Sequence, residues 1–128
     1  MIEVVVYCNP FVISQKPWNA WAVNGKMVLV QLLLPLYDNE GKMFPSHFFT
    51  ALKTELTENF GGITTYTRSP ASGLWKEDDD KVVYDDIIIY EVMAEELDLD
   101  WWKAFKLRLE VHFKQDEIVV RSWPITKL

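Results

Sequence analysis

The chain is poor in the residues that hold metals, disulfides and phosphates: it has one cysteine, two histidines and five glycines among 128 residues. Cys8 alone forms no intrachain disulfide and no cysteine-rich zinc site, which fits a reducing compartment. His47 and His112 have no Cys or His partner at ligand spacing, so we expect no metal and no cofactor. Gly61-Gly62 follows a helical pattern instead of preceding one, so it is a helix stop and not a phosphate loop.

Basic residues are also too few to favour an anionic partner. Thirteen Lys and Arg against nineteen Asp and Glu give a net charge of −6, which repels phosphate backbones and anionic membrane surfaces. No run reaches the ~18–20 apolar residues that a spanning helix needs, and the apolar start Met1 to Tyr7 lacks a basic flank. We therefore expect a soluble, cytoplasmic protein that binds neither nucleic acid nor a membrane.

Apolar residues, in contrast, are abundant: hydrophobic residues make up 49 % of the chain and aromatic residues 14 %. A chain of this length and composition forms one domain with a real core. Residues 1–26 differ from the rest, because Asn9-Pro10, Lys16-Pro17 and Asn24-Gly25 break them repeatedly. We predict a compact domain at 27–128. Residues 1–26 are then an appendage, which is either an added edge strand or a poorly packed arm. The alternative is that residues 2–7 are an integral strand of the domain.

Two segments have the four-residue apolar spacing of a helix that buries one face. The first stripe is Phe48, Leu52, Leu56 and Phe60, and Gly61-Gly62 ends this helix. Pro45 suits its first turn, and we expect Ser46 to cap its free backbone amides. Asp98 is a suitable N-cap for the second helix, whose stripe is Trp101, Phe105, Leu109 and Phe113.

The remaining apolar segments are typical of strands. Residues 28–36 and 82–93 are dense enough to be central strands. A second strand at 63–68 is broken by 69–73, resumes at 74–76 and reaches a charged turn at 77–81, which predicts a long hairpin arm. The last strand, 118–123, is expected to stop at Pro124.

The order from Met27 is strand, helix, strand, strand, helix, strand, which is the ferredoxin-like βαββαβ motif of the α+β class. Right-handed crossovers place both helices on one face of an antiparallel sheet. With the usual strand order 4-1-3-2, strands 28–36 and 82–93 are central, and the other face carries no helix.

Alternation along the strands predicts which side chains this open face presents. If Ile88, Tyr90 and Val92 meet the helices, Glu91 points away from them. The same alternation predicts that the face is largely apolar with a polar cluster on it. The cluster consists of Gln31, Tyr66, Arg68, Glu91 and Arg121.

An apolar face of this extent normally marks a partner or a ligand, and a homodimer through the sheet that binds a small organic ligand is our leading expectation. The ligand-binding candidates are Gln31, Tyr66, Arg68, Trp75, Glu91, Arg121 and Trp123, and Glu91 and Tyr66 are the candidate proton carriers. Two alternatives stay open: a cofactor-independent isomerase or monooxygenase, and a structural interaction module whose cross-strand ion pairs only determine register. Whether the chain is an enzyme is left undecided.

From residue 28 to 123 the chain resembles a family of small bacterial proteins of unknown function with a ferredoxin-like fold. The resemblance rests on a helix that runs into Phe60-Gly61-Gly62, on Gly73-Leu74-Trp75 and on Asp85-Asp86 before the apolar strand. The layout is also similar to the dimeric α+β barrel superfamily, whose members include monooxygenases, isomerases and stress-response proteins that use the open sheet face. This resemblance implies a site between sheets but no particular reaction.

Overall fold

Five antiparallel strands form one sheet in the order β1-β3-β4-β2-β5, and two helices pack on it. The computed structural model describes residues 3–5, 25–78 and 81–128, with side chains described within 25–66 and 86–128. The elements in chain order are β1 (Glu3–Val5), β2 (Lys26–Pro35), α1 (Ser46–Phe60), β3 (Ile63–Asp78), β4 (Lys81–Ala94), α2 (Leu99–Phe113) and β5 (Val120–Thr126).

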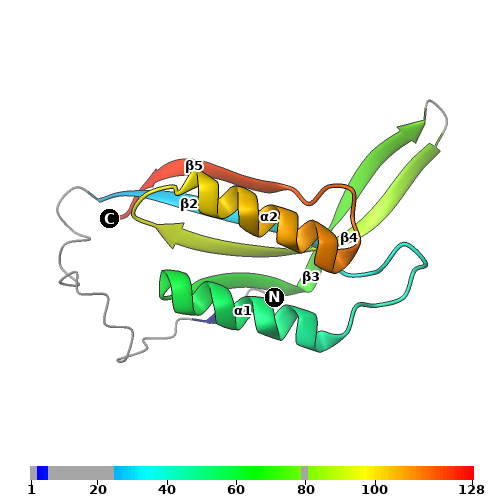
Figure 1. Ribbon diagram of the computed structural model, residues 1–128, viewed down its shortest axis with the longest axis horizontal. Coiled ribbons are helices and arrows are strands. Elements are labelled where there is room, and N and C mark those ends of the chain that lie inside the picture. The colour runs from blue at the N-terminus through cyan, green and yellow to red at the C-terminus, as the bar shows by residue number, and fades with distance from the viewer. Residues whose placement is uncertain (1–2, 6–24, 79–80) are drawn as a thin grey trace.

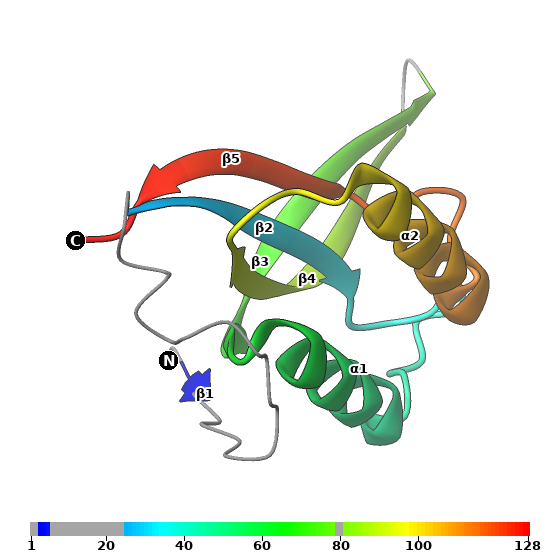
Figure 2. The same ribbon diagram turned by 60° about the vertical axis from the view of Figure 1, so that its left-hand side comes forward.

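From β2 onward this is the predicted ferredoxin-like arrangement, with β2 and β4 in the centre of the sheet. Both views of the ribbon place α1 and α2 on the same side of the sheet (Figures 1 and 2). The short strand β1 adds to the edge beside β3, where Val4 lies opposite Thr64. The division of the chain at residue 26 stays a prediction, since residues 6–24 lie outside the described part.

The core lies between the helices and one face of the sheet. The even-numbered residues Val30, Leu32 and Leu34 of β2 are buried, as are Ile88, Tyr90 and Val92 of β4. These strand residues meet Leu52 and Leu56 of α1 and Phe105, Leu109 and Phe113 of α2. Successive side chains along each strand therefore point alternately to the core and to the opposite face of the sheet.

The helix ends follow local chemistry, with one correction. Asp98 caps α2 as predicted, since its Oδ1 accepts a hydrogen bond from the backbone N–H of Trp101 at 3.0 Å. Gly61 ends α1 with a left-handed φ of 78°. Ser46, however, is the first helical residue and caps nothing, because Pro45 occupies the N-cap position and no side chain bonds the free amides there.

Two strand boundaries also differ from the prediction. β3 does not end at Arg68 but continues to Asp78, with an irregularity in its pairing to β4 between Tyr66 and Ala71. Pro70, which has no N–H to donate, lies within this interruption of the pairing, so the strand can continue beyond it. The hairpin arm that results extends beyond the helices (Figure 1).

The last strand likewise passes through Pro124, which lies opposite Val28, and reaches Thr126. Proline is tolerated there because β5 is an edge strand, so one side of its backbone needs no partner within the sheet.

Candidate functional site

A polar row crosses the sheet on the face that turns away from the helices. Gln31 of β2 lies directly opposite Glu91 of β4 on one side and Arg121 of β5 on the other. Glu91 in turn lies opposite Thr64 of β3. Because directly paired residues of antiparallel strands point to the same face, Thr64, Glu91, Gln31 and Arg121 form one line across four strands.

Hydrogen bonds connect three adjacent members of this row, Glu91, Gln31 and Arg121. The Nε of Arg121 donates to Oε1 of Gln31 at 2.7 Å, and Nε2 of Gln31 donates to Oε1 of Glu91 at 2.8 Å. Gln31 is only 8 % exposed, Glu91 is half-buried and Arg121 is exposed. The amide therefore joins a carboxylate and a guanidinium that keep contact with solvent.

Tyr66 joins the row at its acidic end. It lies two residues along β3 from Thr64, which places it diagonally across from Glu91 and within reach of a long side chain. The pKa of Tyr66 is raised above the ordinary value of 10.0, first by burial, then by the charge of Glu91 and by a hydrogen bond to that carboxylate. At neutral pH the Tyr66 hydroxyl therefore keeps its proton and donates a hydrogen bond to the carboxylate of Glu91.

Apolar side chains surround the row. Leu29 lies opposite Met93 on one side and Trp123 on the other, and Leu33 lies opposite Ile89. Met93 is 42 % exposed and Trp123 is 38 % exposed. A sheet face with large apolar residues open to solvent and a charged row across its centre is a candidate contact surface.

Of the seven ligand-binding residues predicted from sequence, four belong to this polar constellation: Gln31, Tyr66, Glu91 and Arg121. Trp123 lies on the same face, since its pairing partner Leu29 is two residues from Gln31 in β2. The side chains of Arg68 and Trp75 lie outside the described residues. Arg68 falls in the irregular stretch after Tyr66, so the alternation that assigned its face does not extend that far.

Thr64 and Met93 belong to the same face but were absent from the predicted site. Both follow the alternation that identifies Tyr66 and Glu91, so the signal was present in the sequence. The prediction left them out because it kept only charged and aromatic groups and the amide of Gln31.

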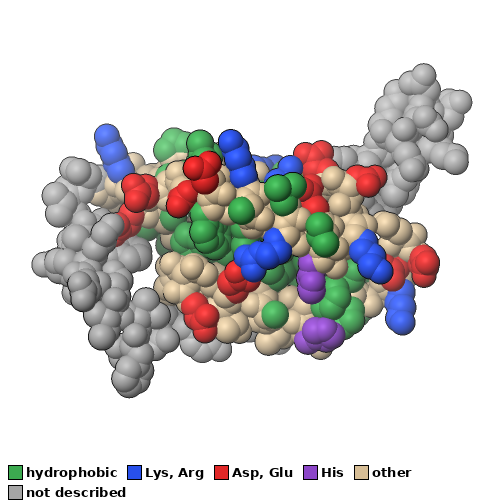
Figure 3. Space-filling view, viewed as in Figure 1, with side chains coloured by type: hydrophobic (Ala, Val, Ile, Leu, Met, Phe, Trp, Pro, Cys, Tyr) green, Lys and Arg blue, Asp and Glu red, His purple; other side chains and the backbone are tan. Residues whose placement is uncertain are grey.

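The helical side of the molecule has a different character. Acidic and basic side chains intermingle on it (Figure 3). His47 and His112 both pack against Phe48, with ring centroids 5.0 and 4.0 Å apart. Among the side chains that the structure describes, at 25–66 and 86–128, no three of His, Cys, Asp or Glu gather as metal ligands would.

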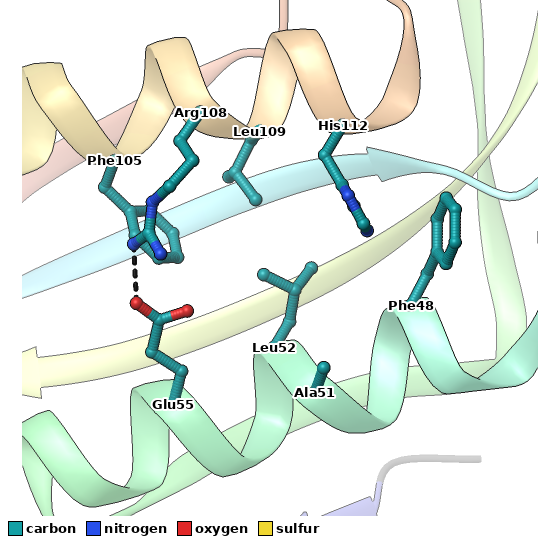
Figure 4. A pocket seen from close by; sticks show the side chains of 8 residues that line it. All are labelled: Phe48, Ala51, Leu52, Glu55, Phe105, Arg108, Leu109 and His112. Carbon is teal, nitrogen blue, oxygen red and sulfur yellow. Dashed lines mark hydrogen bonds and ion pairs between the residues drawn. The ribbon is translucent and has the colours of Figure 1, made fainter.

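A shallow groove of about 180 Å³ runs between the two helices on this side (Figure 4). Glu55 of α1 and Arg108 of α2 form an ion pair across it, and the guanidinium of Arg108 also lies 5.0 Å from the ring centre of Phe105. No sequence pattern links Glu55 to Arg108, because the contact depends on how the two helices pack. The groove and the polar row lie on opposite sides of the sheet, which itself separates them.

No helix in the described ranges combines the length and apolar character needed to cross a membrane.

Comparisons with known proteins support the fold and little beyond it. No protein-family model matches the sequence, and no curated protein matches it. A solved structure with a similar fold is a phage SAM lyase in complex with S-methyl-5'-thioadenosine, at 12 % sequence identity and a TM-score of 0.54. The likeness covers 80 % of this chain and 91 % of the lyase chain. At this identity it supports a small α+β antiparallel fold that fits a ferredoxin-like domain.

Proposed function

We propose that the open face of the sheet binds a small organic ligand, and that the protein works as a homodimer formed through this face. The observation that carries the proposal is the hydrogen-bonded row Glu91–Gln31–Arg121 within apolar surroundings. Polar and charged groups weaken a purely apolar contact, because their desolvation costs free energy unless every hydrogen-bonding position finds a partner. Their presence in the centre of an apolar face favours recognition of a polar ligand.

The similar fold suggests where a ligand search starts. The phage SAM lyase was solved with S-methyl-5'-thioadenosine, a nucleoside that carries an aromatic base and an apolar thioether. Tyr66 and Trp123 provide aromatic surfaces on this face, and aromatic side chains stack favourably on planar ring systems. SAM and S-methyl-5'-thioadenosine are therefore the first compounds to test, together with small acids and aromatic metabolites.

The ligand proposal is tested by thermal unfolding of the purified chain with and without each compound. We expect at least one compound to raise Tm in a concentration-dependent manner, because a ligand that binds only the folded state stabilises it. Glu91→Gln and Arg121→Gln should abolish the rise, whereas Glu58→Gln and Arg108→Gln, on the helices, should retain it. An equal response in all five proteins, or no response to any compound, would contradict the proposal.

The homodimer is tested by sedimentation velocity across a range of protein concentrations. Met93→Lys adds a charge at an exposed apolar position of the open face and should shift the protein to monomer. Leu107→Lys makes the same change on α2, where the side chain is 64 % exposed, and should leave the dimer intact. A wild-type protein that sediments as a monomer at all concentrations would refute the dimer.

A second candidate function is cofactor-independent catalysis, which the pairing of Tyr66 with Glu91 favours. The raised pKa of Tyr66 keeps its hydroxyl protonated, so Glu91 is the group that can accept a proton from a substrate and Tyr66 the group that can donate one. Mass spectrometry of compounds that raise Tm would detect turnover. Catalysis by this pair requires Tyr66→Phe, which keeps the ring but removes the hydroxyl, to abolish turnover while the compound still raises Tm.

A further inference from the structure

The middle residue of the polar row is buried and hydrogen-bonded to both of its neighbours. Gln31 accepts from Arg121 through its amide oxygen and donates to Glu91 through its amide nitrogen, and it is buried. These two bonds also determine the orientation of the amide, since the oxygen must face the guanidinium and the nitrogen the carboxylate. A ligand on this face therefore meets the two ends of the row more readily than its centre.

The basic end of the row keeps most of its donors. A guanidinium has about five N–H donors, and only the Nε–H of Arg121 is bonded, to Gln31. The N–H groups of its two terminal nitrogens make no hydrogen bond to any described residue. These nitrogens form the end-on fork that binds a carboxylate through two parallel hydrogen bonds.

The acidic end keeps acceptor positions. A carboxylate offers about four acceptor sites, and Gln31 and Tyr66 occupy two of those on Glu91. The remaining positions suit an ammonium or another cationic donor. The ring of Tyr66 lies beside the same carboxylate and can add a cation–π contact.

The separation of the two ends follows from the sheet. Glu91 and Arg121 lie on strands on either side of β2, so their backbones are two strand spacings, or about 10 Å, apart. Between them the face is apolar above and below Gln31, where Leu29 and Leu33 lie on the same side of β2.

We infer that the ligand of this face is an elongated zwitterion, with a carboxylate bound by Arg121, a cationic group bound by Glu91 and an apolar body between them. This inference rests on the proposed ligand-binding function and adds the chemical class of the ligand. A ligand with anionic groups at both ends places one of them against Glu91, and a ligand with two cations places one against Arg121. Among ligands that are charged at both ends, only those with opposite charges satisfy the row.

The test uses three compounds that differ only in their end groups: 8-aminooctanoate, octanoate and octylamine. The extended chain of 8-aminooctanoate has a span comparable to two strand spacings. Binding to the full chain is measured by NMR titration, with the amide signals of β2 and β4 and the side-chain signal of Gln31 as readouts. We expect 8-aminooctanoate to bind at least tenfold more tightly than either singly charged compound.

Variants assign each charge to its residue. Arg121→Gln should weaken 8-aminooctanoate to the level of octylamine, and Glu91→Gln should weaken it to the level of octanoate. Arg121→Lys, which keeps the charge but lacks the fork, should give an intermediate affinity. Arg108→Gln, on the helical side, should bind like the wild type.

Similar affinities for all three compounds would overturn the zwitterion while leaving ligand binding by this face in place. The inference also fails if 8-aminooctanoate does not bind but another compound raises Tm through Glu91 and Arg121. If no compound binds in either experiment, the proposed function fails as well.

Discussion

Gln31 and Glu91 occupy directly paired positions of the two central strands, and the amide nitrogen of Gln31 donates to the carboxylate of Glu91 at 2.8 Å. The same amide accepts from Arg121 on the other side, so one buried side chain connects three strands. This arrangement makes Gln31 the structural centre of the candidate site.

Replacement of Gln31 by Leu should lower the free energy of unfolding by about 1–2 kcal/mol, because two hydrogen bonds to charged groups are lost while water can still reach both partners. Urea denaturation followed by circular dichroism measures the change. Glu58→Gln, at an exposed position of α1, should stay within about 0.5 kcal/mol of the wild type. A Gln31→Leu protein as stable as the wild type would show that the row contributes nothing to stability.

Tyr66 should make stability fall at high pH. Its pKa in the folded protein lies above the ordinary value of 10.0, so above pH 10 the unfolded chain releases this proton while the folded chain retains it. The stabilisation is complete below pH 10 and is lost as the pH rises through the folded-state pKa. Urea unfolding between pH 8 and 11 should therefore show a steeper decline for the wild type than for Tyr66→Phe.

The cause of the raised Tyr66 pKa can be tested separately by a spectroscopic titration of tyrosinate. Glu91→Gln removes the negative charge, so the pKa should fall toward 10.0. It should not reach that value, because burial is the largest cause and remains. An unchanged titration would show that Glu91 does not influence the phenol.

Asp98 and Ser46 form a matched pair of helix starts. Asp98→Ala should cost about 1 kcal/mol, because the free N–H of Trp101 loses its acceptor. Ser46→Ala should be nearly neutral, since its side chain caps nothing. Thermal and urea unfolding of both variants provide the comparison, and equal losses would contradict the assigned caps.

Leu56→Ala should cost about 2–5 kcal/mol, because the side chain is fully buried between α1 and the sheet and its truncation leaves a cavity. Leu107→Ala removes the same atoms from an exposed position of α2 and should have little effect. Equilibrium unfolding in urea gives both values. A cooperative unfolding transition of Leu56→Ala at the wild-type midpoint would show that α1 does not pack as described.

Gly61→Ala should destabilise the protein by about 1–2 kcal/mol, because the residue has a left-handed φ of 78° that an L side chain adopts at a cost. No atom lies near the added methyl group, so backbone strain alone is measured. Gly62→Ala, which also has open space but no positive φ, should be close to neutral. A loss of equal size at both positions would contradict the strain argument.

The sequence predicted those features that depend on neighbours along the chain. Asp98 and Gly61 are identified by capping chemistry within a few residues, and the alternation of Tyr90 with Glu91 follows from the geometry of any strand. The order of strands and helices followed from the same local patterns and topological rules. The four-residue spacing placed Trp101 in the buried stripe of α2, but Trp102 is the more buried of the two. Spacing alone does not distinguish two adjacent apolar residues at the start of a helix.

Local patterns by themselves determined the helices, their ends and the face on which each regular strand residue lies, because the forces involved act between residues a few positions apart. Only the tertiary structure decided that Gln31 meets Glu91 and Arg121, which are 60 and 90 positions away, or that Glu55 reaches Arg108. It also decided that β3 continues beyond Pro70 and β5 through Pro124. Whether a proline ends a strand depends on the hydrogen bonds of the neighbouring strand, which are formed only when distant segments pair.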